Sequence, residues 1–234
     1  MSPERVPVND PEVLQRILAN ADAVLLDFDG PICDVFAGFP AHLVADQLRR
    51  VLAEGGYDEL PAQIEKTEDP FDVLYYAATL GDDEAEYVEA SQRAHEVEAV
   101  ASSEPTPGAH DFIRAWHASG RVLAVVSNNS AAAVEAYLHL HELTACVDYV
   151  SARADSDSSR LKPSPFLLQQ ASEHLKITAA RGVLIGDSLT DIQAAHAAGA
   201  RVIGYANRPG KVDLFASEMP QAIVTDLTYL NSAL

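Results

Sequence analysis

The stretch that most constrains the fold is a short apolar run that leads straight into two acidic residues. Residues 24–26 are Val-Leu-Leu, and they continue into Asp27 and Asp29, followed by Gly30 and Pro31. An apolar run that ends in Gly and Pro is typical of a buried strand breaking at its C-terminal end. In an open parallel sheet ligands bind at the carboxyl ends of strands, so both carboxylates are expected in a crevice. Taken alone, the stretch also fits a surface turn with two solvated Asp side chains.

From Pro31 to Glu104 strand patterns are absent and three amphipathic helices are predicted. The first ends at Gly55, and the second begins at Asp69 and closes at Gly81. The third is acidic, and its predicted packing face consists of residues spaced by three and four: Tyr87, Ala90, Ala94, Val97 and Ala101. This region holds 17 acidic residues against four basic ones, which accounts for −13 of the net charge of −19. The charge shift indicates a separate all-helical module.

From Pro105 onward strand and helix patterns alternate. Strands are expected at 122–126, 146–150, 183–185 and 201–204, with helices at 109–120, 131–140, 165–175 and 191–198 and a polar loop at 151–159. Such alternation indicates βαβ units and a parallel sheet. Another helix is expected before the first strand, from Asp10 as N-cap. The predicted fold is α/β: a Rossmann-like three-layer core of residues 1–32 and 105–234, with a helical cap domain of residues 33–104.

Composition excludes several functional classes. The net charge of −19 argues against nucleic acid and anionic membranes as partners. The apolar runs are strand-sized and residues 1–11 are polar, so neither a transmembrane helix nor a signal peptide is expected. Cys33 and Cys146 lie far apart and form no metal or redox spacing, so no disulfide is expected and a cytoplasmic location is predicted.

Polar residues suited to phosphoryl transfer follow three of the predicted strands. Asp27 and Asp29 follow the first; the others are Ser127, Asn128, Asp187 and Asp191, with Lys162 between them in sequence. Phosphoryl transfer needs a nucleophile in line, a metal for the phosphoryl oxygens, and positive charge or N–H donors for the rest. A carboxylate serves as nucleophile when it forms an aspartyl-phosphate. Each group has another interpretation, such as a helix cap or a solvated side chain, but the combination favours one shared site.

Four motifs in order carry a family resemblance: DFDG after the first strand, SNN after the second, then LKP and GDSLTD. Together they resemble the motifs of the haloacid dehalogenase-like (HAD) hydrolase superfamily. The helical insert after the first motif resembles the cap of the phosphoglycolate phosphatase and β-phosphoglucomutase branch. The resemblance covers nearly the whole chain. One departure is Pro31, where relatives usually carry Thr or Val, so the cap hinge is expected to differ.

The resemblance implies a role for each matching residue. Asp27 would be the nucleophile, and Asp29 would protonate the leaving-group oxygen and then activate water. Ser127 and Lys162 would contact the phosphoryl group. The main chain of Phe28 and of Asn128 would also contact the substrate.

The same resemblance implies a Mg²⁺ site. Its predicted ligands are Asp27, Asp187, the backbone carbonyl of Asp29, and Asp191, the last acting through water. Dehalogenase members lack an acid at the position of Asp29, so its presence favours a phosphatase or a phosphomutase. Asp34 is interpreted as a hinge residue, whereas Asp155 and Asp157 are expected to be solvated.

The predicted function is a Mg²⁺-dependent phosphatase that hydrolyses a small phosphomonoester through an aspartyl-phosphate, similar to phosphoglycolate phosphatase. The alternatives are a phosphosugar mutase similar to β-phosphoglucomutase and a non-catalytic binding protein. The expected partner is a small phosphorylated metabolite, and the chain is expected to be a monomer or a homodimer. Candidate contacts to the leaving group are His42, Arg49, Arg50 and Lys66, although the acidic cap disfavours a second anionic group. Arg208 and Lys211 are candidate sources of positive potential near the phosphate.

Overall fold

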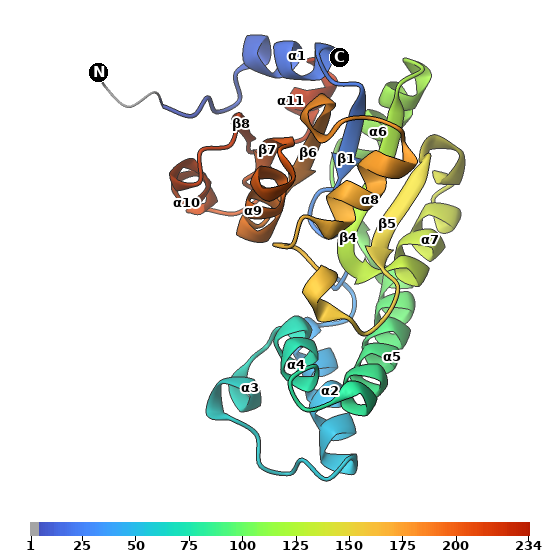
Figure 1. Ribbon diagram of the computed structural model, residues 1–234. Coiled ribbons are helices and arrows are strands. Elements are labelled where there is room, and N and C mark those ends of the chain that lie inside the picture. The colour runs from blue at the N-terminus through green and yellow to red at the C-terminus, as the bar shows by residue number, and fades with distance from the viewer. Residues whose placement is uncertain (1–4) are drawn as a thin grey trace.

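The computed structural model describes residues 5–234 and is built on a six-stranded parallel sheet (Figure 1). The strands lie in the order β5-β4-β1-β6-β7-β8. Their bounds are Ala23–Leu26 for β1, Val122–Ser130 for β4, Tyr149–Arg153 for β5, Gly182–Gly186 for β6, Arg201–Tyr205 for β7 and Ala222–Val224 for β8. Leu26 pairs with Val125 of β4 and Ile185 of β6, so β1 is central and its carboxyl end lies between two neighbours. This is the predicted Rossmann-like α/β core.

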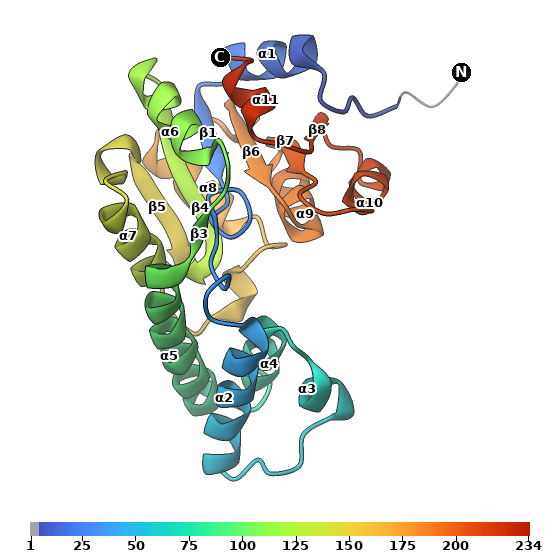
Figure 2. The ribbon, with the colours of Figure 1, turned by 180° about the vertical axis from the view of Figure 1, so that it is seen from behind.

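Helices cover both faces of this sheet because its strands are apolar on both sides. The face that carries Val24 and Leu26 packs against α1 (Pro11–Ala19), α6 (Ala109–Ala118), α7 (Ala131–Leu140) and α11 (Thr228–Asn231). The face that carries Leu25 packs against α8 (Phe166–His174), α9 (Leu189–Ala198) and α10 (Lys211–Ser217). The two views of Figures 1 and 2 show these layers from opposite sides.

The other helices gather at one end of the molecule, below the sheet in Figure 1. They are α2 (Ala41–Glu54), α3 (Ala62–Lys66), α4 (Pro70–Ala77) and α5 (Asp82–Ala99). Two short strands, β2 (Cys33–Asp34) and β3 (Glu104–Pro105), pair antiparallel where this segment leaves and rejoins the rest of the chain. The domain boundaries at 33 and 104 stay a prediction, and they coincide with this two-stranded ladder.

Capping side chains begin several of these helices where the sequence predicts it. The Asp10 carboxylate accepts the backbone N–H groups of Glu12 and Val13, and the Asp69 carboxylate accepts that of Phe71. Each cap satisfies backbone donors that the first helical turn leaves free. The described part of the chain also contains four 3₁₀ turns: η1 (Val100–Ser102), η2 (Thr144–Cys146), η3 (Ser158–Arg160) and η4 (Ala179–Arg181).

The predicted packing face of the third cap helix is wrong. On α5, Tyr87 is 68% exposed and Val97 is 38% exposed. The buried face consists instead of Ala85, Val88, Glu89, Gln92, Glu96 and Ala99. Hydrophobic spacing misleads here because two carboxylates on this face are buried beside Arg153, whose guanidinium approaches both.

Two smaller sequence predictions also need correction. The strand predicted at 146–150 is β5 at Tyr149–Arg153, so residues 151–153 belong to the sheet and not to a loop. Strand β8, which extends the sheet beyond β7, has no counterpart among the predicted elements. Within residues 5–234, no helix combines the length and the apolar character needed to cross a lipid bilayer.

Candidate active site

The predicted site residues converge on one pocket at the carboxyl end of the sheet. The pocket has a volume of about 230 Å³. Its lining from the strand ends comprises Asp27, Asp29, Ser127, Asn128, Asn129, Lys162, Asp187, Ser188 and Thr190. These residues are far apart in sequence, but parallel strands bring their carboxyl ends to one edge. Asp191 lies directly behind this lining and is fully buried.

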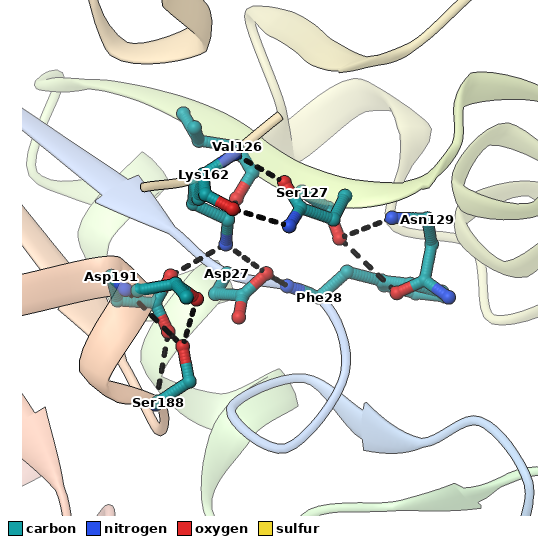
Figure 3. Close-up of polar contacts among 10 residues, drawn as sticks. Asp27, Phe28, Val126, Ser127, Asn129, Lys162, Ser188 and Asp191 are labelled. Carbon is teal, nitrogen blue, oxygen red and sulfur yellow. Dashed lines mark hydrogen bonds and ion pairs between the residues drawn. The ribbon is translucent and has the colours of Figure 1, made fainter. Parts of the chain in front are cut away.

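Lys162 lies at the centre of the site, with its side chain 2% exposed (Figure 3). Its Nζ atom lies 2.8 Å from Asp27 Oδ1 and 2.5 Å from Asp191 Oδ1, and it donates to the Val126 carbonyl at 3.1 Å. Burial opposes the charged ammonium, but Asp191 and Asp27 outweigh this cost and raise the pKa of Lys162 above its usual value. Lys162 is therefore a fixed positive charge beside the nucleophile that the sequence predicts.

Asp27 presents its two carboxylate oxygens differently. Oδ1 accepts the Phe28 backbone N–H at 2.7 Å and also contacts Lys162 (Figure 3). Oδ2 has no hydrogen-bond donor within the part of the chain that the structure describes. Burial, followed by the negative charge of Asp191, raises the pKa of Asp27 well above its ordinary value. The fold thus holds this carboxylate at a free-energy cost and leaves one oxygen open to the pocket.

Asp29 lies in the same pocket but in a different environment. Its Oδ1 accepts the Val35 backbone N–H at 3.0 Å. Burial raises the pKa of Asp29 to about 7, against the opposing effect of that hydrogen bond. A carboxyl group with such a pKa can both donate and accept a proton near neutral pH.

The end of β4 is held by side chains from three segments. The Asn128 side chain is bonded to the backbone of Lys162, donating to its carbonyl at 3.1 Å and accepting its N–H at 2.8 Å. Ser127 Oγ donates to Asn129 Oδ1 at 3.2 Å, and Asn129 Nδ2 donates to Glu96 at 3.2 Å. Helix α5 therefore contacts the end of β4 that carries Ser127 through a chain of hydrogen bonds.

The carboxylates of Asp27, Asp187 and Asp191 form the candidate metal centre, with one oxygen from each lying within 4.8 Å of the others. Glycines permit this close approach: a Cβ at Gly30 would overlap the Asp187 carboxylate, and one at Gly186 would overlap that of Asp191. Gly30 also has φ +97°, a conformation that other residues rarely adopt. Oxygen donors on carboxylates suit Mg²⁺, so the residues fit the metal that the family resemblance implies.

The acids of this centre have different partners. Asp187 Oδ2 accepts Lys211 Nζ at 2.7 Å and Asn207 Nδ2 at 3.0 Å. Asp191 is engaged at both oxygens, Oδ1 by Lys162 and Oδ2 by Ser188. This arrangement fits the predicted action of Asp191 through water. The Asp29 carboxylate is not part of the cluster, so its predicted contribution remains that of its backbone carbonyl.

Several residues of this site were missed or misplaced by the sequence analysis. Lys211 contacts the Asp187 carboxylate itself. The second donor to that carboxylate, Asn207, carries no motif that could have identified it. The pocket wall from the cap is formed by Asp69, Phe71 and Tyr75, which had been interpreted only as helix residues. None of the four predicted leaving-group contacts, His42, Arg49, Arg50 and Lys66, lines the pocket.

The remaining sequence candidates lie elsewhere. Arg208 and Asp34 are exposed. Asp155 and Asp157 are exposed and form ion pairs with Arg160 at 2.8 and 2.9 Å, as expected of solvated acids.

Comparison with known proteins identifies the family. Residues 21–199 match the model of the haloacid dehalogenase-like hydrolases. The chain is 30% identical to a phosphoglycolate phosphatase from Nitrosospira multiformis, over 77% of this chain and 81% of the relative. It is 34% identical to a bifunctional riboflavin kinase/FMN phosphatase from Arabidopsis thaliana, over 47% of this chain but only 29% of the relative.

The fold has matches among solved structures as well. A predicted phosphatase from Clostridium acetobutylicum superposes with a TM-score of 0.67 at 16% identity, covering 89% of this chain and 95% of that one. At this identity the match concerns the fold alone. The family model and the similarity to the N. multiformis enzyme show that the chain belongs to the haloacid dehalogenase-like hydrolases.

Proposed function

We propose that this chain is a Mg²⁺-dependent phosphatase that hydrolyses a small phosphomonoester through a phosphoryl group carried on Asp27. The observation that carries the proposal is the convergence of Asp27, Asp29 and Lys162 on one pocket. The similarity to enzymes named as phosphatases supports the same reaction class.

The reaction proceeds through two successive displacements at phosphorus. In the first, Asp27 Oδ2 attacks phosphorus, the bond from phosphorus to the ester oxygen breaks, and Asp29 donates its proton to that oxygen. In the second, a water molecule gives a proton to Asp29 and attacks phosphorus, and the bond to Asp27 breaks. Inorganic phosphate leaves, and both carboxyl groups return to their starting states.

The other groups hold the phosphoryl oxygens. Lys162 supplies a fixed positive charge. The Ser127 hydroxyl lines the same pocket and would turn from Asn129 to a phosphoryl oxygen, and the Phe28 N–H would turn from Asp27 in the same way. Mg²⁺ held by Asp27 and Asp187 would neutralise the charge that the phosphoryl oxygens carry in transfer. Asp191 holds Lys162 in place and closes the back of the site.

The test is phosphate release by the purified full chain from a panel of small phosphomonoesters, with Mg²⁺ and with a chelator. Turnover is expected with Mg²⁺ and not with the chelator, and it is expected to vanish in Asp27→Asn. When turnover of an ester with a radiolabelled phosphoryl group is quenched with acid, the label should remain on the wild-type chain. The Asp27→Asn variant should carry no label. Retained turnover in Asp27→Asn would remove the proposed nucleophile.

The same assay separates the alternatives. A phosphosugar mutase would move the label to a second sugar hydroxyl with little release of phosphate. A non-catalytic binding protein would neither release phosphate nor acquire label. We also propose a cytoplasmic location, which the two free cysteines, Cys33 and Cys146, support. That the chain is a monomer or a homodimer remains a prediction.

A further inference from the structure

The part of the pocket wall that the cap contributes comes from α4 and its N-cap residue. Asp69, Phe71 and Tyr75 line the pocket together with the catalytic carboxylates. One Asp69 oxygen caps the helix by accepting the Phe71 N–H at 2.9 Å. The other has no protein donor within residues 5–234; because Asp69 is exposed, this oxygen is open both to solvent and to a ligand in the pocket. Tyr75 is 36% exposed and lines the pocket together with Phe71 and Asp69.

The charges of the pocket are strongly unbalanced. Four Asp side chains line it, and of the lining residues in the described chain only Lys162 is cationic. Lys162 is already shared between Asp27 and Asp191. The phosphoryl group and a divalent cation roughly neutralise each other, so neither supplies spare positive charge. A second anion on the substrate would lie near Asp69 without a counter-ion.

Within the described residues, no cationic side chain of the cap lines the pocket, and two arginines near α4 are engaged elsewhere. Arg49 donates to the backbone carbonyls of Ile64 and Thr67 at 3.0 and 2.9 Å and pairs with Asp46. It therefore holds the segment before α4 and is not free for a ligand. Arg153 lies 5.9 Å from the Phe71 ring, but its guanidinium pairs with Glu96 at 2.6 Å.

We propose that Asp69 determines specificity by selecting a leaving group that carries hydrogen-bond donors, hydroxyl or ammonium, and rejecting one with a carboxylate or a second phosphate. Phe71 and Tyr75 pack against the carbon skeleton of that group. The proposal rests on the proposed phosphatase function and sets this chain apart from a relative named for phosphoglycolate, which carries a carboxylate.

The test compares three phosphomonoesters of nearly equal size: 2-phosphoglycolate, 2-hydroxyethyl phosphate and 2-aminoethyl phosphate. Each is measured as a substrate and as a competitor of an aryl phosphate, with the full chain and Mg²⁺. The variants are Asp69→Asn, which keeps a capping side chain, and Asp72→Asn as the matched control. Asp72 is on the same helix and bonds Thr67, but it does not line the pocket.

The expected kcat/KM of the wild type is at least tenfold higher for the hydroxyl and amino esters than for phosphoglycolate. Asp69→Asn should raise the ratio of kcat/KM for 2-phosphoglycolate to kcat/KM for 2-hydroxyethyl phosphate about tenfold. The same variant should lower the ratio of kcat/KM for 2-aminoethyl phosphate to that for 2-hydroxyethyl phosphate. Asp72→Asn should change neither ratio. The proposal is overturned if phosphoglycolate is turned over, or competes, as well as the hydroxyl ester, or if Asp69→Asn leaves both ratios unchanged. If no ester releases phosphate, the aryl phosphate included, the proposed function fails and takes this inference with it.

Discussion

Lys162 and Arg153 are both buried cations placed between two carboxylates, and the molecule uses them differently. Lys162 lies between Asp27 and Asp191 with its side chain 2% exposed. Arg153 has its side chain 1% exposed and pairs with Glu96 at 2.6 Å, while Glu89 lies at 3.8 Å. The first cluster lines the pocket through Lys162 and Asp27, whereas Arg153 and its partners are closed off from it.

The two clusters differ most in how Glu96 and Asp27 are satisfied. Glu96 accepts from Arg153, from the Ser130 N–H at 2.8 Å and from the side chains of Asn129 and Gln92 at 3.2 Å. Asp27 has one free oxygen, and its pKa is raised by burial and by Asp191. A closed ion pair that joins a helix to the core contributes structure, whereas an open one holds charge ready for a ligand. The difference therefore lies in access to the pocket and in hydrogen bonding, not in the pairing of charges.

The largest expected effect is on activity when the open cluster loses its cation. Lys162→Met should lower kcat/KM by about 10³-fold or more, roughly 4 kcal/mol of transition-state stabilisation, because the phosphoryl charge loses its fixed partner. Steady-state kinetics on the preferred phosphomonoester measure this. Lys66→Met, an exposed cap lysine outside the pocket, serves as the control and should match the wild type. A Lys162→Met enzyme within tenfold of wild type would contradict the assigned role.

The next effect is on stability when the closed cluster loses its cation. Arg153→Met should reduce the free energy of unfolding by about 3–5 kcal/mol, because Glu96 remains buried without a counter-ion and Glu89 keeps only the exposed Arg93. Urea unfolding measures this, with Arg93→Met as the control, since Arg93 is exposed and lies 3.5 Å from Glu89. If both variants lose the same small amount, Arg153 does not stabilise the contact of α5 with the core.

Neutralising one carboxylate should lower the free energy of unfolding in the closed cluster but not in the open one. Glu96→Gln should cost about 2 kcal/mol, because it weakens charge-assisted hydrogen bonds from Arg153 and the end of β4. Asp27→Asn should leave the free energy of unfolding unchanged or raise it by about 1 kcal/mol. The reason is that the raised pKa of Asp27 marks an ionised form that folding disfavours. Equal destabilisation in parallel urea titrations would remove the distinction between the clusters.

The smallest effect concerns two half-buried histidines without carboxylate partners. His110 and His141 pack around Tyr137, and burial lowers the pKa of both. As pH falls, the histidines of the unfolded chain take up protons before those of the folded chain. The stability that the neutral histidines contribute is therefore present above pH 6.5 and is lost as pH falls below it.

The expected contribution of the two histidines between pH 7 and 5 is less than about 1 kcal/mol, because both groups are partly solvated. Urea unfolding at several pH values should show a shallower decline for His110→Gln/His141→Gln than for wild type. His139→Gln, at an exposed position, should follow the wild type. An identical slope in all three proteins would mean that the half-buried histidines take up protons as freely as exposed ones.

Local sequence determined the chemical parts of this protein. Residues 24–29 could be interpreted as a strand that ends in two acids because apolar side chains must leave water and a turn must follow. The same logic placed Ser127, Lys162, Asp187 and Asp191 at the edge of a parallel sheet, where the structure brings them together. Local sequence patterns are enough to predict such site residues, because the carboxyl ends of parallel strands meet at the same edge of a sheet.

Only the tertiary structure decided which cap residues contact the pocket and which face of α5 is buried. Apolar spacing favoured Tyr87 and Val97, but packing buries Glu89 and Glu96, because Arg153 from a distant strand is there to pair with them. Likewise Asp69 carries only the pattern of a helix cap, and its place in the pocket depends on how α4 lies over the sheet. The burial of a charge depends on a partner that the local sequence does not contain.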